Sequence, residues 1–253
     1  MALHFKCSPV ELDDDQILDY LHVLKSQHHT PSESFFKHTV YGLRYVYRLY
    51  DKEESRIQLP AIKGQKTLPV VLSTKEIKLL LKTPKLLKHR LIIGLLYGCG
   101  LRCFELRNVK IRDIDFDRKV LHVTHGKGGK QRYMPLCDLL LAGIEKYLVA
   151  ENPVQWLFNG NNKQGEKTHL SPRGVQFAVQ QARKRSGILK LITTHTLRHT
   201  YATHLLEMGL DIMSVKELLG HQDIQTTLIY LHVSRVERMD VFSPLEKLYP
   251  TSS

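Results

Sequence analysis

Apolar residues recur at helical spacing along most of the chain, and one stretch near its middle has strand character instead. This stretch comprises residues 119–124 and 131–136, and the glycine-rich residues 126–130 between them are typical of a β-hairpin connection. The helices expected after residue 70 cover residues 73–98, 138–150, 171–186, 194–208, 211–219 and 224–231. The sequence therefore predicts a mainly α protein with a small β-sheet, of the α+β class.

Two helices are expected near the N-terminus. Apolar residues repeat at helical spacing in residues 17–24, and a second apolar stripe follows in residues 36–50. Residues 51–70 then carry charges and prolines with little periodicity, which is typical of a linker. We expect a short helical N-terminal domain at residues 1–55, a linker at 56–70 and a second domain at 71–253.

The chain is strongly basic. Its 253 residues include 37 Lys and Arg against 25 Asp and Glu, which gives a formal net charge of +12 at pH 7. Such an excess indicates a polyanionic partner, first of all nucleic acid, although proteins that touch anionic membranes or simply stay soluble also carry it. Collagen-like, mucin-like and disordered chains are excluded, because 42% of the residues are hydrophobic and suffice to bury a globular core.

Cysteine usage and apolar runs indicate the compartment. Four cysteines in a chain of this length do not make a disulfide framework. The N-terminus lacks the apolar core of a signal peptide, and the longest apolar run, residues 91–97, is far shorter than the roughly 20 residues of a membrane span. We therefore expect reduced thiols and a soluble, cytoplasmic protein with no membrane partner.

Short motifs toward the C-terminus carry polar side chains that could act together. His195 and Arg198 are three residues apart in an expected helix, so they share one face. His221 follows Gly220, where another helix should end, and Tyr230 comes nine residues after His221. Taken singly, these motifs have ordinary explanations: a solvated helix face, a capping histidine and a buried tyrosine.

Two earlier motifs complete a recognisable order. Arg102 lies in a turn after Gly100 and before a helix, and Lys127 lies in the expected hairpin. The tyrosine recombinases, also called phage integrases, share a characteristic motif order. It consists of an Arg in a turn, a Lys on a hairpin, His-x-x-Arg, Leu-Gly-His and then a Tyr. The sequence resembles this family from about residue 68 to residue 233. The resemblance implies a mixed catalytic domain with the site residues Arg102, Lys127, His195, Arg198, His221 and Tyr230.

The resemblance implies that DNA is cleaved and rejoined without metal, cofactor or ATP. Tyr230 would attack a DNA phosphate, leaving a 3′-phosphotyrosyl link and a free 5′ hydroxyl. Arg102 and Arg198 would hold the phosphate oxygens, because guanidinium groups stay charged and bind oxygen pairs in a fork. The protein would then be a site-specific DNA recombinase, acting in integration and excision or in resolution.

Other side chains are expected to donate or accept protons. Lys127 would protonate the 5′ oxygen leaving group, and Lys130 is the rival for this role. Because imidazoles titrate near neutral pH, His195 would accept the proton of Tyr230, and His221 would donate a hydrogen bond to a phosphate oxygen.

The resemblance also implies a clamp around double-stranded DNA, formed by a helical core-binding domain and the catalytic domain. The N-terminal domain is shorter than the four-helix core-binding domain usual in the family. A homotetramer on two DNA sites and accessory DNA-bending proteins are the further expected partners, and the apolar tail at residues 241–248 would dock on a neighbouring subunit or pack back in cis. The basic residues expected to contact phosphates, with a solvated basic face as the alternative, are Lys37, His38, Arg44, Arg48 and Lys130.

Other functions remain open at this point. A type IB topoisomerase shares the nucleophile and much of the site but would relax supercoils without pairing two duplexes. A DNA-binding protein without cleavage is the non-enzymatic alternative. A metallohydrolase would use His195 and His199, four apart on a helix, but Thr196 stands where its general base belongs. Cys99 and Cys103 are expected to be buried rather than to bind metal.

Overall fold

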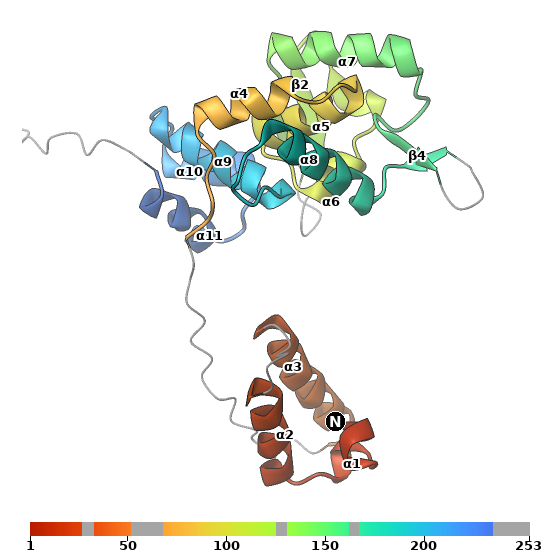
Figure 1. Ribbon diagram of the computed structural model, residues 1–253, viewed down its shortest axis with the longest axis vertical. Helices are drawn as coiled ribbons and strands as arrows, with labels where there is room; N and C mark the ends of the chain where they lie inside the picture. Colours follow the sequence, from red (N-terminus) through yellow and green to blue (C-terminus); the bar gives the residue numbers. More distant parts are fainter. Residues whose placement is uncertain (27–32, 52–67, 125–130, 162–166, 235–253) are drawn as a thin grey trace, which may run out of the picture. The chain divides into compact units, whose positions relative to one another are not determined.

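The computed structural model describes residues 1–26, 33–51, 68–124, 131–161 and 167–234. The chain divides into two compact units, Met1–Thr67 and Leu68–Ser253 (Figure 1). Most of the expected linker, residues 56–67, lies outside the described residues, as do the glycine-rich residues 126–130 and the tail after residue 234.

The first unit is helical. Its elements are α1 (Ala2–Phe5), a 3₁₀ turn (Pro9–Glu11), α2 (Asp14–Ser26) and α3 (Glu33–Leu49). Helices α2 and α3 pack through the apolar stripes that the sequence predicts, with the buried residues Ile17, Leu21, Val40, Leu43 and Tyr47. Tyr50, expected in the second stripe, is instead 65% exposed, because α3 ends one residue before it.

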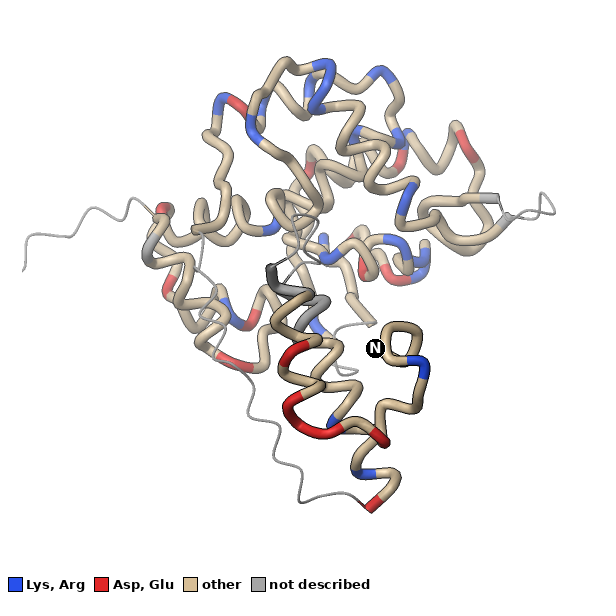
Figure 2. The backbone as a smooth tube through the Cα atoms, turned by 60° about the horizontal axis from the view of Figure 1, so that its bottom comes forward, with Lys and Arg blue, Asp and Glu red and all other residues tan. Residues whose placement is uncertain are grey.

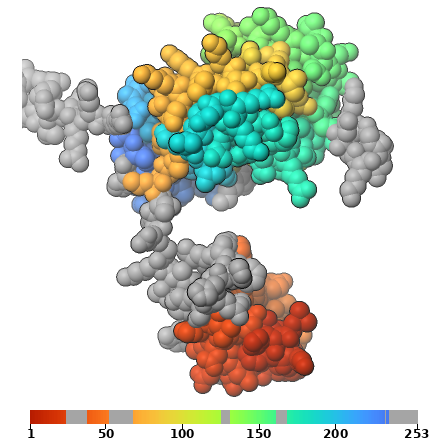
Figure 3. All heavy atoms as spheres, viewed as in Figure 1, coloured from red at the N-terminus to blue at the C-terminus, as the bar shows by residue number. Residues whose placement is uncertain are grey.

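The second unit holds most of the helices. They are α4 (Thr74–Lys82), α5 (Leu87–Gly98), α6 (Cys103–Arg107), α7 (Asp138–Glu151), α8 (Pro172–Ser186), α9 (Thr194–Glu207), α10 (Ile212–Leu219) and α11 (Gln225–Leu228), with a 3₁₀ turn, η4 (Ile229–His232), directly after α11. Helix α5 is buried along most of its length and packs against α4, α7, α8 and α9. Helix α8 lies beside α4 on the face that Figure 3 displays, and α9, α10 and α11 lie together in Figure 1.

The helical stretch expected at residues 73–98 consists of two helices, α4 and α5. Its predicted start is confirmed: the Ser73 hydroxyl accepts the N–H of Glu76 at 3.2 Å, and the Glu76 carboxylate accepts the N–H of Ser73 at 2.7 Å. The break falls at Pro84, because proline has no amide hydrogen and its ring disfavours helical backbone in the residue before it.

Two small antiparallel sheets accompany the helices. The first has the order β1 (Ile114–Asp115), β2 (Val120–Val123) and β3 (Arg132–Pro135). Strands β2 and β3 are the predicted hairpin strands, and Val123 pairs with Arg132. The second sheet, β4 (Asn159–Asn161) with β5 (Lys167–His169), was not predicted, because these short polar strands show no apolar alternation.

None of the described helices combines the length and the apolar content that spanning a bilayer requires.

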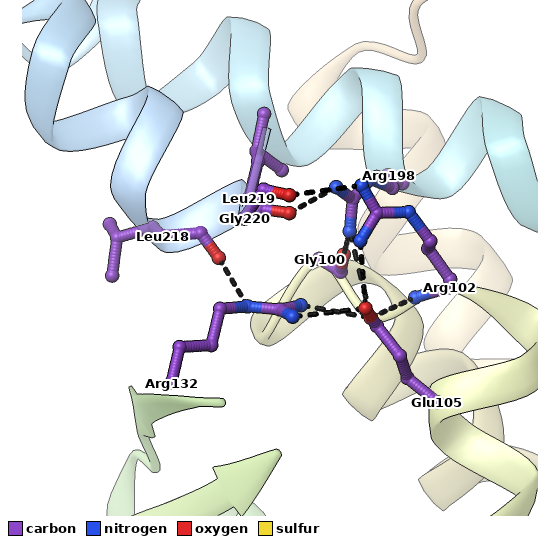
Figure 4. A network of polar contacts seen from close by, with 8 residues as sticks. All are labelled: Gly100, Arg102, Glu105, Arg132, Arg198, Leu218, Leu219 and Gly220. Atoms are coloured by element: carbon purple, nitrogen blue, oxygen red, sulfur yellow. Dashed lines mark hydrogen bonds and ion pairs between the residues drawn. The ribbon is translucent and has the colours of Figure 1, made fainter. Parts of the chain in front are cut away.

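Several elements meet in one region of the second unit (Figure 4). They are the C-terminal end of α5, the start of α6, strand β3 and the helices α9 and α10. This region holds the candidate site.

Candidate active site

A buried carboxylate lies at the centre of this region. Glu105, in α6, is 3% exposed and accepts hydrogen bonds from the backbone N–H and a guanidinium nitrogen of Arg102, both at 2.8 Å. Arg132 of β3 donates two guanidinium nitrogens to the same carboxylate, at 2.9 and 2.8 Å. A guanidinium nitrogen of Arg198, from α9, lies 3.8 Å from it. Figure 4 shows the arginines reaching Glu105 from separate elements.

The carboxylate is ionised, and its surroundings remain positive. Burial alone would raise the pKa of Glu105, but the hydrogen bonds and charge of Arg132, together with the hydrogen bonds from Arg102, lower it to about 2. One negative charge thus faces three guanidinium groups. A positive excess of this kind in a partly buried site favours an anionic ligand such as a phosphate.

Arg198 is held by backbone carbonyls from two turns. Its guanidinium donates to the carbonyl of Gly100 at 2.5 Å and to the carbonyl of Leu219, the last residue of α10. Burial, and then the charge of Arg102, lowers the pKa of Arg198 to about 10, so the group is charged at neutral pH. Gly100 has a φ of +55°, and a Cβ there would lie 2.4 Å from the ring of Tyr201. Only glycine therefore lets this turn bring its carbonyl to Arg198.

The guanidinium groups differ in exposure. The side chain of Arg102 is 22% exposed, against 10% for Arg132 and 4% for Arg198. Arg102 also donates to the carbonyl of Gly220, at the longer distance of 3.4 Å. Of these three groups, Arg102 has the most freedom to turn toward a bound anion.

Tyr230, in η4, lies beside this cluster. It is 2% exposed, and its hydroxyl oxygen lies 2.9 Å from Nδ1 of His199 in α9. Burial raises the pKa of Tyr230, and the charges of Arg198 and Arg102 offset this only in part. The phenol is therefore protonated at neutral pH, and it needs a proton acceptor before it can act as a nucleophile.

His221 follows α10, which ends at the left-handed Gly220 as predicted. Its Nδ1 lies 2.9 Å from the hydroxyl oxygen of the buried Thr227, and its ring centroid lies 6.4 Å from that of Tyr230. Burial, and then the charges of Arg198 and the other site arginines, lower the pKa of His221 to about 4. This imidazole is neutral at pH 7 in the free protein.

His195 was expected to accept the proton of Tyr230. It lies exposed in the first turn of α9, and its ring centroid is 6.4 Å from that of His199. In the described part of the chain, His199 provides the imidazole contact with the Tyr230 hydroxyl. Lys127 and Lys130 lie outside the described residues, so their roles stay predictions. Of the expected site residues, the structure brings together Arg102, Arg198, His221 and Tyr230.

Several residues of this site were not among those predicted from the sequence. The sequence offered one indication for Glu105: it is an acidic residue inside an otherwise apolar turn, three positions after Arg102. Arg132 shares the inward face of β3 with the buried Met134, which is an unusual place for a cation. His199 was considered only as a metal ligand, and Thr227 was not considered.

The basic residues expected to contact DNA stay predictions. His38, Arg44 and Arg48 lie exposed on α3. The side chain of Lys37 is not among those that the structure describes. In the second unit, Lys and Arg are spread over many elements (Figure 2).

The cysteines at the turn after α5 are engaged in packing. Cys99 is buried, its Sγ lies 3.7 Å from the carbonyl oxygen of Pro135, and burial raises its pKa to about 12. Cys103 is half-buried, and burial also raises its pKa. Across the described ranges, no three His, Cys, Asp or Glu side chains are grouped as metal ligands would be. His204, near the end of α9, shares a 2.9 Å hydrogen bond with Tyr97.

Comparison with known proteins identifies the family. Residues 70–237 match the sequence model of the phage integrase family. The chain belongs to this family. It is 39% identical over 199 residues to the tyrosine recombinase XerA of Thermococcus onnurineus, a match that covers 77% of this chain and 69% of the relative. It is 40% identical over 184 residues to the XerA of Pyrococcus horikoshii, covering 73% of this chain and 63% of the relative.

A solved member of the family has the same fold. The XerH site-specific recombinase, in a post-cleavage complex with its palindromic difH substrate, superposes with a TM-score of 0.72 at 22% identity, covering 94% of this chain and 72% of that one. The predictions of a tyrosine recombinase and of a mainly α fold with a small β-sheet are confirmed. The chain is an enzyme of this family, whose reaction is site-specific DNA recombination.

Proposed function

We propose that the chain recombines double-stranded DNA at specific sites by transferring a DNA strand to Tyr230 and then to a second duplex. The observation that carries this proposal is that a tyrosine hydroxyl, two imidazoles and several guanidinium groups lie close together. The guanidinium groups outnumber the one carboxylate among them. These groups supply a nucleophile and donors for a phosphate in one place.

The reaction makes one bond and breaks one bond in each half. The oxygen of Tyr230 forms a bond to phosphorus, the bond from phosphorus to the 5′ oxygen breaks, and a 3′-phosphotyrosyl link and a 5′ hydroxyl result. One proton leaves the phenol and one proton is added to the 5′ oxygen. The 5′ hydroxyl of a second duplex reverses these steps, so that neither a metal ion nor ATP is needed for rejoining.

Arg102 and Arg198 would hold the non-bridging oxygens of the scissile phosphate. Arg102 is the more exposed and can turn from the carbonyl of Gly220 toward the anion. Glu105 acts as a positioning residue in this proposal, because it binds Arg102 and Arg132 and lies near Arg198 without reaching a phosphate itself. Preorganised donors of this kind stabilise the charge that develops in the transition state.

His221 suits the role of a neutral donor. When the Thr227 hydroxyl donates to Nδ1 of His221, the ring proton resides on Nε2, which then donates to a phosphate oxygen. The low pKa of His221 is consistent with a donor that does not change its charge near neutral pH.

Lys127 would protonate the 5′ oxygen, with Lys130 as the alternative. The register pairs Val123 with Arg132, so residues 124–131 connect β2 to β3 and carry both lysines. Arg132 joins the base of this connection to Glu105 and to the carbonyl of Leu218. This anchoring supports a hairpin lysine working beside the arginines.

The assembly on DNA is part of the same proposal. Two observations support a double-stranded DNA partner: the net charge of +12, and the complex of the relative XerH with its difH DNA. In this proposal the helical N-terminal domain and the catalytic domain both hold the duplex. The phosphate contacts come from Lys37, Arg44, Arg48 and Lys130. Exchange between two duplexes requires several active sites at once, which favours a homotetramer, with accessory DNA-bending proteins to direct it. Since the substrate is cellular DNA, the activity belongs in the cytoplasm.

A denaturing gel tests the proposal. The protein is incubated, in the presence of EDTA, with nicked suicide duplexes that cover the DNA flanking its reading frame, beside the Tyr230→Phe variant. We expect a DNA–protein adduct with the wild type only, because the variant lacks the attacking oxygen. Binding without any adduct would support the alternative of a protein that binds DNA without cleaving it. Relaxation of supercoiled DNA without strand exchange would support the topoisomerase alternative.

A further inference from the structure

The C-terminal end of α10 meets three guanidinium groups. Three consecutive carbonyl groups there each accept a hydrogen bond from a different arginine (Figure 4). The pairs are Leu218 with Arg132, Leu219 with Arg198, and Gly220 with Arg102. The last carbonyls of a helix lack partners within it and form the negative end of its dipole, so cations are favoured there. The arginines therefore complete the helix end that directly precedes His221.

Arg132 uses each of its three guanidinium nitrogens in this cluster. Its Nε donates to the carbonyl of Leu218 at 2.7 Å, and its two terminal nitrogens donate to the Glu105 carboxylate at 2.9 and 2.8 Å. The side chain is 10% exposed, so it is enclosed by these partners. A guanidinium group can bind on both sides because its N–H groups are fixed in one plane, whereas an ammonium group is a compact point charge.

These contacts join two parts of the chain that carry site residues. Leu218 lies three residues before His221, and we call residues 218–221 the His221 turn. Glu105 lies three residues after Arg102 and also accepts its backbone N–H at 2.8 Å. Arg132 comes from β3, a third element. One side chain of β3 thus connects the His221 turn to the start of α6.

We propose that Arg132 is a positioning residue for strand cleavage, which holds the His221 turn against Glu105. The turn and Arg102 can then act on the same phosphate. This inference rests on the proposed function. Arg132 acts through its two partners and does not reach the phosphate itself, since each of its nitrogens is already engaged.

Arg102 cannot hold the His221 turn in place of Arg132. Its bond to the carbonyl of Gly220 is long, at 3.4 Å, against 2.7 Å from Arg132 to Leu218. Arg102 also releases that carbonyl when it turns toward a bound anion. Arg132 is then the arginine that still ties the turn to Glu105 while the phosphate reacts.

Geometry and charge can be separated at this position. Burial, and then the charges of Arg198, Arg102 and Arg132, lower the pKa of His221. A lysine in place of Arg132 would keep the positive charge but could not bind a carboxylate and a carbonyl together in the same way. Arg132→Lys therefore tests the fork of hydrogen bonds rather than the charge.

The matched control is Arg107→Lys. Arg107 is also partly buried, donates its Nε to the carbonyl of Leu170 at 2.6 Å, and lies 2.6 Å from Nε2 of His169 through a terminal nitrogen. It thus joins distant parts of the chain as Arg132 does, but it makes no contact with Glu105 or the His221 turn among the contacts of the described residues.

The first measurement is the single-turnover rate of adduct formation on the suicide duplex that wild type cleaves, at saturating DNA, together with the dissociation constant for that duplex. Arg132→Lys should slow adduct formation by about 10²-fold, the usual cost of a misplaced site group. Its dissociation constant should change little, because Arg132 does not bind the phosphate. Arg107→Lys should keep the wild-type rate.

Three results with an active wild type would overturn the inference while leaving the proposed function intact. They are a near wild-type rate in Arg132→Lys, an equal loss of rate in Arg107→Lys, and a loss of DNA affinity in Arg132→Lys as large as its loss of rate. If wild type forms no adduct on any duplex, the proposed function fails, and the role of Arg132 in cleavage fails with it.

Hydrogen exchange tests the positioning without DNA. The backbone N–H groups of Gly220 and His221 bond to carbonyls within α10, and that of Met208 bonds to His204 at the end of α9. In Arg132→Lys the first two should exchange with solvent faster than in wild type, because the turn opens locally, while Met208 should be unchanged. Unchanged exchange at Gly220 and His221, or an equal acceleration at Met208, would overturn the inference.

A measurement on wild type decides the matter if Arg132→Lys does not fold. The Nε–H of Arg132 is buried and bonded to the carbonyl of Leu218, so in ¹⁵N-labelled protein it should exchange slowly with solvent. An Nε–H that exchanges as fast as that of an exposed arginine would show that Arg132 does not hold the turn.

Discussion

Glu105→Gln should destabilise the protein strongly, because the substitution removes the negative charge that Arg132 and Arg102 share in their contact with this buried side chain. The pKa of Glu105 falls from 4.5 to about 2 in the folded protein. At about 1.4 kcal/mol for each pKa unit, the folded surroundings favour its ionised form by roughly 3 kcal/mol. Removal of one partner from a buried ion pair costs about 3–5 kcal/mol. The free energy obtained from the pKa of Glu105 therefore agrees with the usual cost of breaking a buried ion pair.

The assay is the free energy of unfolding from urea titrations of wild type and variant at pH 7. The matched control is Asp138→Asn, which breaks a pair of similar length, 2.7 Å to Lys119, whose side chains are 83% and 56% exposed. We expect the control to lose less than about 1 kcal/mol, because exposed pairs contribute little. Equal losses in the two variants would refute the argument that burial makes the Glu105 contact strong.

The pH dependence gives an independent check with a definite sign. The pKa of Glu105 is lower in the folded state than its ordinary value of 4.5, so its stabilisation is complete above that pH and is lost as the pH falls toward 2. Wild type should therefore lose stability over this window more steeply than Glu105→Gln. Parallel profiles for the two proteins would show that Glu105 is not held ionised by its arginines.

Other substitutions test the remaining parts of the site. Arg198→Ala should slow adduct formation by at least the 10²–10³-fold that one transition-state donor is typically worth, measured on the cleavable suicide duplex, and a near wild-type rate would remove Arg198 from the site. Gly100→Ala should lower the melting temperature more than Gly187→Ala, since both have positive φ but only Gly100 lacks room for a Cβ; equal shifts would refute the steric argument. Thr227→Val should slow cleavage with little change in DNA affinity, because His221 loses the partner that orients its ring, and an unchanged rate would contradict that role.

The sequence was most informative where the controlling contacts are local. The capping box at Ser73 and the end of α10 at Gly220 depend on atoms within a few residues, and both are present as predicted. The hairpin strands β2 and β3 were also predicted. The motif order was sufficient for the family, because the spacing of several weak signals together is far more specific than any one of them.

The tertiary structure decided which of these side chains meet. Glu105 binds Arg132 from a strand 27 residues later, and no local pattern in the sequence links them. Both His195 and His199 lie on α9, four residues apart, so helical spacing alone could not say which one faces Tyr230. That choice depends on how α9 packs against η4, which begins about 30 residues further along the chain. Contacts within a helical turn are set by neighbours in the sequence, whereas the partner of a catalytic hydroxyl is set by the packing of distant elements.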